Sequence, residues 1–158
     1  PIIVHGTNML DSRFRAFNAN YQLGFVIEQF LATHFLSNSD VFDRFPELRI
    51  LICHCGGALS RFIRTTRDRD TSKNLFFDTC SYETNLLEAA IKQRGVNQVC
   101  FGSEAPGSGG AIRPETGRTS DDMVPVIDSF GFLSTEDKVK IFNHNAAKVF
   151  PGLATATG

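Results

Sequence analysis

The stretch RILICHCGG, residues 49–57, decides the fold of this chain. Its apolar run ILIC has the length and residue types of a strand buried on both faces, which predicts a strand over residues 48–54. The run ends in the polar imidazole of His54, and Gly56 and Gly57 then break the strand and leave room for a ligand to approach. A buried strand that ends in a polar side chain is typical of an α/β fold whose site lies at the rim of a parallel sheet.

Three further segments are predicted strands, and each ends in a polar side chain. Residues 1–5 (PIIVH) end in a histidine, residues 74–79 close with an aspartate, and residues 96–101 lead into a glutamate through Gly-Ser. Because the carboxyl ends of parallel strands lie at the same edge of a sheet, these side chains are predicted to converge on one site. The converging residues are His5, His54, Asp78 and Glu104.

Helical patterns lie between the strands and after them. Four strands alternating with helices predict a parallel sheet with right-handed crossover connections, in one unit over residues 1–153 followed by a frayed tail, 154–158. The segment 103–119 is predicted to be a long polar loop, a length that in compact domains is usually functional. The predicted helices are residues 20–36, 58–67, 85–94, 121–130, 134–142 and 145–150.

Composition narrows the classes of function. The 158 residues carry a formal net charge of −1, which gives no reason to expect nucleic acid or an anionic membrane as partner. No apolar run reaches the roughly 18 residues of a membrane span, so we expect a cytoplasmic protein. Cys53, Cys80 and Cys100 lie in or beside predicted strands and are expected to be buried thiols, and no disulfide is expected. The Cys-His-Cys sequence at 53–55 does not have the spacing of a zinc site.

Three of the converging residues also have a purely structural interpretation. His5 could cap its strand through a backbone hydrogen bond. Glu104 could ligate a metal or transfer protons, or it could cap a helix or pair with a loop arginine. Asp78 could hold a neighbouring histidine in one tautomer, or it could only cap its strand. The functional interpretation is favoured for His5, His54 and Glu104 because three strand ends agree.

Arginines are the candidates for binding a substrate carboxylate, since guanidinium groups form bidentate pairs with such groups. Arg113 and Arg118 lie in the long loop, and Arg13 follows the first strand. The sequence GSGG at 107–110 lacks the Lys-Ser/Thr that completes a phosphate-binding loop. The two other histidines, His34 and His144, are expected to be structural.

Four segments, FPELRILICHCGG, NLFFDTCSYE, VCFGSEAP and IFNHNAAKVFPGL, resemble the amidohydrolase-related family that includes aminocarboxymuconate-semialdehyde decarboxylase, resorcylate decarboxylases and 4-oxalomesaconate hydratase. The resemblance implies a (β/α)8 barrel of the TIM type, of which this chain is the C-terminal half, strands five to eight. It also implies one divalent metal, often zinc. His5 and Glu104 would be metal ligands, and His54 and Glu104 the catalytic residues that activate water or move protons.

The sequence GSE, followed by RPETG and a pair of aspartates, looks most like the 4-oxalomesaconate hydratase branch. The implied reaction is hydration of an unsaturated oxo-carboxylic acid, with decarboxylation or hydrolysis as alternatives. A function of a different class also remains open: the chain could be an inactive half barrel or a binding scaffold that holds no metal. The family's HxH motif, which supplies two metal ligands, is absent from this chain. We therefore expect either a homo-oligomer or a complementing N-terminal half as partner.

Overall fold

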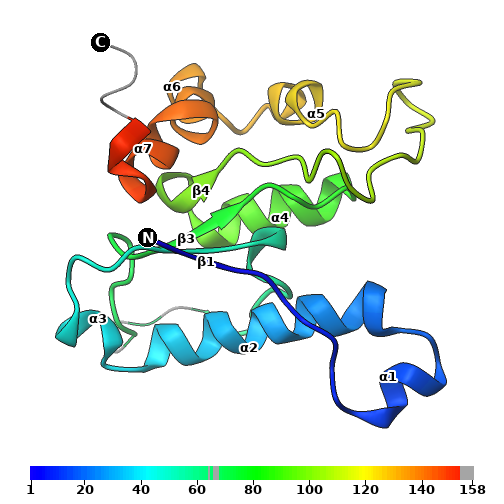
Figure 1. Cartoon of the computed structure of the whole chain (residues 1–158). Helices are drawn as coiled ribbons and strands as arrows, with labels where there is room; N and C mark the ends of the chain where they lie inside the picture. The colour runs from blue at the N-terminus through cyan, green and yellow to red at the C-terminus, as the bar shows by residue number, and fades with distance from the viewer. Residues whose placement is uncertain (64, 66–67, 154–158) are drawn as a thin grey trace.

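The computed structural model describes residues 1–63, 65 and 68–153 and contains one parallel four-stranded sheet (Figure 1). The strands are β1 (Ile2–Val4), β2 (Ile50–Ile52), β3 (Leu75–Asp78) and β4 (Val99–Cys100), in the order β1-β2-β3-β4. All three pairings are parallel, which confirms the predicted fold class. Each strand is shorter than its predicted range, and β4 begins late because residues Val96–Gln98 form a 3-10 turn before it.

The two faces of the sheet bury different side chains. Ile50, Ile52, Leu75 and Phe77 form one cluster with Phe42, and the apolar residues of helix α2 (Phe25–Asn38) pack against it. The opposite face carries Phe76 and Cys100, which are covered by Val149 near the C-terminus. Since successive strand residues point to opposite faces, the register fixes which polar residues beyond the strands can meet.

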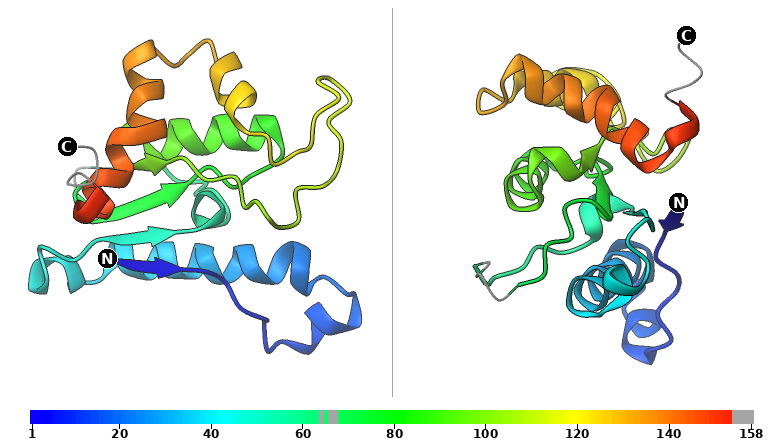
Figure 2. Two further views of the ribbon diagram at one scale, coloured as in Figure 1. Left: turned by 45° about the horizontal axis from the view of Figure 1, so that its top comes forward. Right: turned by 90° about the vertical axis from the view of Figure 1, so that its left-hand side faces the viewer.

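Helix α2 is the longest element and lies along the strands, opposite the C-terminal helices (Figures 1 and 2). It continues a π-helical turn, Asn20–Gly24, so the predicted helix over residues 20–36 is confirmed and extends to Asn38. Two short helices, α1 (Ser12–Ala16) and α3 (Val41–Arg44), flank it. Within the described ranges, no helix is both long and apolar enough to cross a lipid bilayer.

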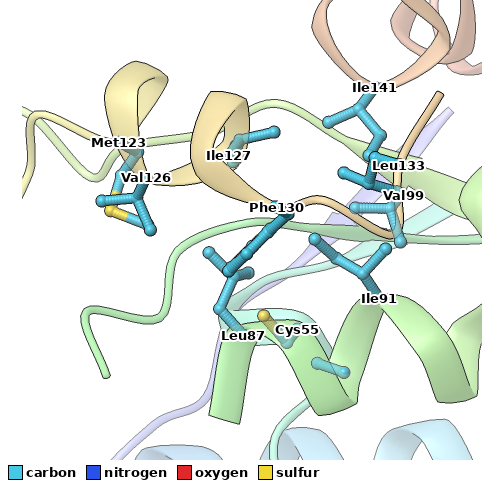
Figure 3. Close-up of a cluster of buried hydrophobic side chains, with 11 residues drawn as sticks. Cys55, Leu87, Ile91, Val99, Met123, Val126, Ile127, Phe130, Leu133 and Ile141 are labelled. Carbon is cyan, nitrogen blue, oxygen red and sulfur yellow. The ribbon is translucent and has the colours of Figure 1, made fainter. Parts of the chain in front are cut away.

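A second core joins α4 (Thr84–Arg94) to the C-terminal helices. Leu87 and Ile91 of α4 meet Ile127 of α5 (Val124–Ser129) and Val99 of β4 (Figure 3). The predicted helices 134–142 and 145–150 form one continuous run. It consists of α6 (Thr135–Val139), a π-helical turn (Lys140–His144) and α7 (Asn145–Val149). Short 3-10 turns span His54–Gly56, Val96–Gln98 and Pro151–Leu153.

The predicted helix over residues 58–67 is wrong for the part that the structure describes, 58–63 and 65. Side chains of α4 occupy the backbone groups that a helix would use internally. Gln93 bonds both the N–H and the carbonyl of Ser60, and Arg94 donates to the carbonyl of Ala58. The apolar residue Ile63 is 88% exposed, so no helical face is buried here. The predicted tail, 154–158, lies outside the described residues.

Leu87→Ala should destabilise the chain by about 2–5 kcal/mol, because it removes a fully buried side chain and leaves a cavity in the second core. The adjacent Leu86 is 44% exposed, so Leu86→Ala is the matched control and should change the free energy of unfolding by less than about 1 kcal/mol. Urea unfolding followed by circular dichroism measures both. Equal losses in the two variants would contradict the assigned core.

Candidate active site

The turn that carries His54 is held in an unfavourable backbone conformation. His54 and Cys55 both have positive φ, 51° and 57°, and Gly56 and Gly57 continue the left-handed run. Non-glycine residues in this region cost on the order of 1–3 kcal/mol and persist only where the surroundings fix them. Here Asp78 Oδ1 accepts from the N–H of Cys55, and Arg94 donates to the Cys55 carbonyl.

The two glycines after this turn serve the packing of α2 and β3, and the space beside them is not open to a ligand. A Cβ at Gly57 would lie 2.0 Å from the carbonyl oxygen of Val26, and one at Gly56 would lie 2.5 Å from the Phe77 ring. The expectation that Gly56 and Gly57 leave room for a ligand is therefore wrong. They leave room for the α2 backbone, which comes close enough to contact the histidine turn.

His5, His54 and Glu104 meet at the carboxyl edge of the sheet, as predicted. His54 Nε2 lies 3.4 Å from Glu104 Oε2, and the rings of His5 and His54 are 5.0 Å apart between centroids. His5 is exposed and its Nδ1 lies 2.7 Å from the Gly6 carbonyl oxygen. The three side chains thus come from three different strand ends and can act on one small molecule.

Tyr82 is a site residue that the sequence reasoning missed. Its hydroxyl donates to Glu104 Oε2 at 3.0 Å and lies 3.3 Å from Ser108 Oγ. Burial and the neighbouring Glu104 carboxylate raise the pKa of Tyr82 to about 12, so the phenol remains a hydrogen-bond donor at neutral pH. Glu104 itself has a positive φ of 61°. The only sequence indication of Tyr82 was its place just beyond the third strand.

Gln29 is the second residue that was missed. It is fully buried on α2, and its amide lies within 3.0 Å of His54 Nδ1. No motif marks it, because it lies 25 residues before the histidine and in the middle of a helix. Nε2 of His54 therefore faces Glu104, and Nδ1 faces a buried amide.

Asp78 caps backbone groups. Its Oδ1 accepts from the N–H groups of Cys55, at 3.2 Å, and Cys80, at 3.0 Å. Of its two interpretations, the structural cap is confirmed. The carboxylate ties the end of β3 to the turn that carries His54.

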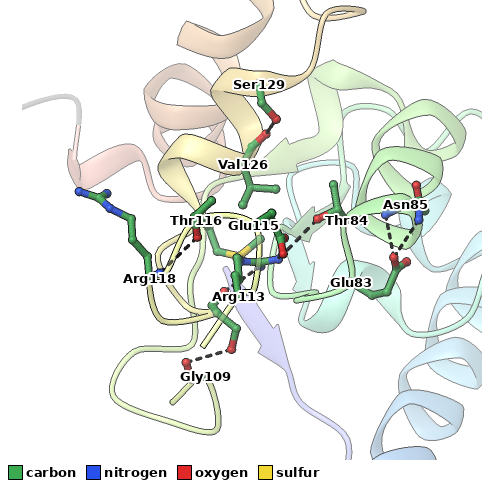
Figure 4. A network of polar contacts seen from close by, with 12 residues as sticks. Glu83, Thr84, Asn85, Gly109, Arg113, Glu115, Thr116, Arg118, Val126 and Ser129 are labelled. Atoms are coloured by element: carbon green, nitrogen blue, oxygen red, sulfur yellow. Dashed lines mark hydrogen bonds and ion pairs between the residues drawn. The ribbon is translucent and has the colours of Figure 1, made fainter. Parts of the chain in front are cut away.

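The three candidate arginines lie in different surroundings. Arg113 is 6% exposed and donates to the Ser120 carbonyl. Its guanidinium also contacts Thr84 at the start of α4 and Glu115 in the loop (Figure 4). Arg118 is exposed and pairs with Asp122, and Arg13 is exposed and pairs with Asp11. None of these contacts joins an arginine to His54 or Glu104, and carboxylate binding stays a prediction for all three.

The donor set for a metal is incomplete within the described part of the chain, where no group of three His, Cys, Asp or Glu side chains could hold a metal ion. The predicted ligands His5 and Glu104 would supply only two donors, and catalytic zinc normally takes three from the protein. The cysteines do not complete the set, because burial raises the pKa of Cys53 to about 12 and that of Cys55 further. These residues alone therefore do not fit a catalytic metal.

Comparisons with known proteins identify the family. The amidohydrolase family model matches residues 1–152. The chain belongs to the amidohydrolase family. It is 31% identical over 167 aligned positions to the 2-keto-4-carboxy-3-hexenedioate hydratase of Sphingobium sp. strain SYK-6, covering 97% of this chain and 47% of that protein.

Solved structures agree with this assignment. The crystal structure of 4-oxalomesaconate hydratase LigJ from Rhodopseudomonas palustris superposes with a TM-score of 0.72 at 28% identity, over 84% of this chain and 44% of that one. A dihydroxybenzoic acid decarboxylase from Polaromonas sp. JS666, solved with bound manganese, shares the fold at 21% identity and a TM-score of 0.66, over 96% and 49% of the chains. The chain thus spans about half the length of these (β/α)8-barrel relatives.

Asp78→Ala should destabilise the chain by about 1–3 kcal/mol, because it leaves the buried N–H of Cys55 without an acceptor. Asp78→Asn keeps an oxygen at the Oδ1 position and should cost less. Asp128→Ala, at an exposed aspartate of α5, is the control and should change the free energy of unfolding by less than about 0.5 kcal/mol. Chemical denaturation measures all three, and a loss for Asp78→Ala as small as the control's would show that the cap is dispensable.

The cysteines of the native chain should react slowly with a thiol reagent at pH 8. Burial raises the pKa of Cys100 to about 12 and raises that of Cys55 and Cys80, so the reactive thiolate is scarce in the folded state. Labelling should accelerate as the pH rises and should be fast for all four cysteines in guanidinium chloride. Rapid labelling of Cys55 or Cys100 in the native chain, read by mass spectrometry, would contradict their burial.

Proposed function

We propose that this chain supplies one half of the active site of a hydratase that adds water to an unsaturated oxo-carboxylic acid. The contact between His54 and Glu104, 3.4 Å apart at the carboxyl edge of the sheet, carries the proposal. The similarity to two hydratases that act on such acids supports the choice of reaction. The chain's decarboxylase neighbours support decarboxylation as the alternative in the same scaffold.

Hydration needs one group that takes a proton from water and one that delivers a proton to carbon. The hydroxide adds to one carbon of the double bond and the proton to the other, so no oxidant or reductant is required. His54 Nε2 and Glu104 Oε2 face each other. One of them would take the proton from water, and the other would deliver a proton to carbon. Tyr82 donates to the same Glu104 oxygen and orients it. In this proposal His54 and Glu104 are the catalytic residues.

The arginines would bind the carboxylates of the substrate. Arg118 and Arg13 are exposed, and each is paired with a single exposed or half-buried aspartate. Such surface pairs contribute little to stability because water screens them, so a substrate carboxylate can compete for the guanidinium. Arg113 is buried and would act by fixing the loop that carries Arg118.

A divalent metal is the implied cofactor, and manganese is bound in two decarboxylase neighbours. We propose zinc here, with His5 and Glu104 as the ligands from this chain. When bound, the metal would polarise the substrate carbonyl and lower the pKa of a bound water. Because two donors are too few, further ligands must come from outside the described residues.

The further ligands would come from a partner that completes the barrel, either an N-terminal half or a second copy of the chain. Strand β1 lies at the edge of the sheet, and Ile2 and Ile3 are 49% and 58% exposed. An exposed apolar edge strand is a template for pairing with another strand. The partner would therefore pair with β1 and bring its own ligands to the same end of the sheet.

The test compares the chain alone with the chain mixed with the part of the Sphingobium hydratase that it does not match. We expect the chain alone to be metal-poor and inactive, and the mixture to bind zinc and hydrate 4-oxalomesaconate. Mass spectrometry measures the bound zinc, and the loss of the substrate's ultraviolet absorbance measures its hydration. Stoichiometric zinc on the isolated monomer would contradict the incomplete donor set. A metal-loaded mixture without turnover would favour the binding scaffold.

Substitutions in the active mixture should separate ligands from proton-transfer groups. His5→Ala and Glu104→Ala should lose the metal, whereas His54→Asn should keep the metal and lose turnover by about 100-fold or more. His144→Asn, at an exposed histidine on the C-terminal helical run, is the matched control and should keep both. Turnover by His54→Asn within twofold of the unsubstituted protein would remove His54 from the reaction.

A further inference from the structure

A cavity lies on the helix-covered face of the sheet, and neither the fold nor the proposed reaction explains it. Helices α2 and α4 pack on the same face, because Phe77 and Val99 are in register and belong to the core clusters of these two helices. Connections between parallel strands usually place a helix on the sheet, but the one from β2 to β3 forms none over 58–63, 65 and 68–73 (Figure 2). A cavity of about 280 Å³ remains on this face, close to the roughly 300 Å³ at which small-molecule sites begin.

Apolar and charged side chains line this cavity together. Phe30 of α2 and Leu75 and Phe77 of β3 supply apolar surface, and Arg94 at the end of α4 supplies a guanidinium. That guanidinium lies over the Phe77 ring, 4.5 Å from its centroid. The two histidines and the glutamate of the candidate active site are not among the described residues that line the cavity. The cavity is therefore separate from the site at the carboxyl edge of the sheet.

Most of the Arg94 side chain is committed to the left-handed turn after β2. Its Nε donates to the carbonyl of Cys55 at 3.1 Å, and its Nη2 donates to those of Gly56, at 3.3 Å, and Ala58, at 3.0 Å. Within the described chain Nη1 donates to no group, and Arg113 Nε is the one buried side-chain nitrogen or oxygen there that lacks a partner. Nη1 is therefore open to solvent, and its two N–H groups are free to bind a ligand.

The charge of Arg94 also lacks a counterion. Arg13, Arg49 and Arg118 each pair with a carboxylate, whereas no ion pair within the described ranges includes Arg94. Burial lowers the pKa of Arg94, because water is partly excluded from its guanidinium. The group nevertheless stays protonated at neutral pH. A half-buried cation that is bonded only to neutral carbonyls is stabilised further by an anion beside it.

We infer that this cavity binds a small aromatic carboxylate, with its carboxylate group on Arg94 Nη1 and its ring against Phe30 and Phe77. Charge-assisted hydrogen bonds to a guanidinium are strong, and aromatic side chains provide the apolar surface on which a ring packs well. Asp68 also lines the cavity, and its negative charge disfavours a phosphate dianion. The site needs neither a metal nor a partner chain, so it is independent of the proposed function.

Calorimetric titration of the whole chain with benzoate tests the inference. We expect saturable binding at one site per chain. Acetate lacks the ring and benzyl alcohol lacks the charge, so each should bind at least about tenfold more weakly than benzoate. Inorganic phosphate should also bind more weakly, because its second negative charge meets Asp68. The inference is overturned if benzoate does not bind, or if either benzyl alcohol or acetate binds as tightly as benzoate.

Amide spectra of the nitrogen-15-labelled chain locate the bound benzoate. Its addition should shift the amide signals of Thr71, Leu75 and Gln98, which line the cavity. Shifts confined to the carboxyl edge of the sheet, around His54 and Glu104, would show binding in the candidate active site and would refute the cavity assignment. Neither zinc nor a partner chain is added, so an inactive hydratase would leave this result unchanged.

Two variants complete the experiment. Arg94→Gln removes the charge and should weaken benzoate binding at least about tenfold. Because it also loses bonds to the turn, Ser37→Trp is the second variant: it fills the cavity from α2, keeps Arg94 and should abolish binding. Leu31→Trp, at a 40% exposed residue of the same helix outside the cavity lining, is the matched control and should bind benzoate normally. Unchanged affinity in folded Ser37→Trp would contradict the inference. If neither variant folds, the amide shifts of the unsubstituted chain decide the location.

Discussion

The close approach of helix α2 to the turn at Gly56 and Gly57 is the constraint on which the site depends. A side chain at Gly57 would collide with the Val26 carbonyl, so only glycine lets the helix reach this turn. The approach brings Gln29 against His54 and Thr33 against Gly56. The left-handed backbone at His54 is stable only because contacts from α2, Asp78 and Arg94 surround it.

The parallel strands and the convergence of their ends could be read from the sequence. Apolar runs that end in polar residues and glycines mark parallel strands, and the topology then places His5, His54 and Glu104 at one edge. The predicted helix over residues 58–67 was wrong in its described part because local amphipathic spacing does not reveal that Gln93 and Arg94 compete for its backbone groups. Such competition depends on contacts between distant segments.

The support around the reactive side chains could not be read in the same way. Tyr82 and Gln29 reach the site from a loop and from the middle of a helix, and their roles follow from distances of about 3 Å that no periodicity encodes. For the arginines, the sequence suggests a role that the structural contacts do not by themselves support. The residue type of Arg113 suits carboxylate binding, but its burial commits it to the Ser120 carbonyl. Residue type therefore predicts candidates for carboxylate binding, and burial shows which contacts the fold already makes with each of them.

The incomplete metal-ligand set and the exposed β1 edge have a common cause. A barrel strand contributes both backbone hydrogen bonds to its neighbours and side chains to the site at its carboxyl end. This chain covers about half the length of its relatives and its described part holds four strands, so under the proposed function it would supply about half of each contribution. The polar contacts of His54 with Gln29 and Glu104, by contrast, arise entirely within the four strands and their helices. The contacts around His54 are therefore local to the described strands and helices, whereas under the proposed function the further metal ligands would come from the partner that pairs with β1.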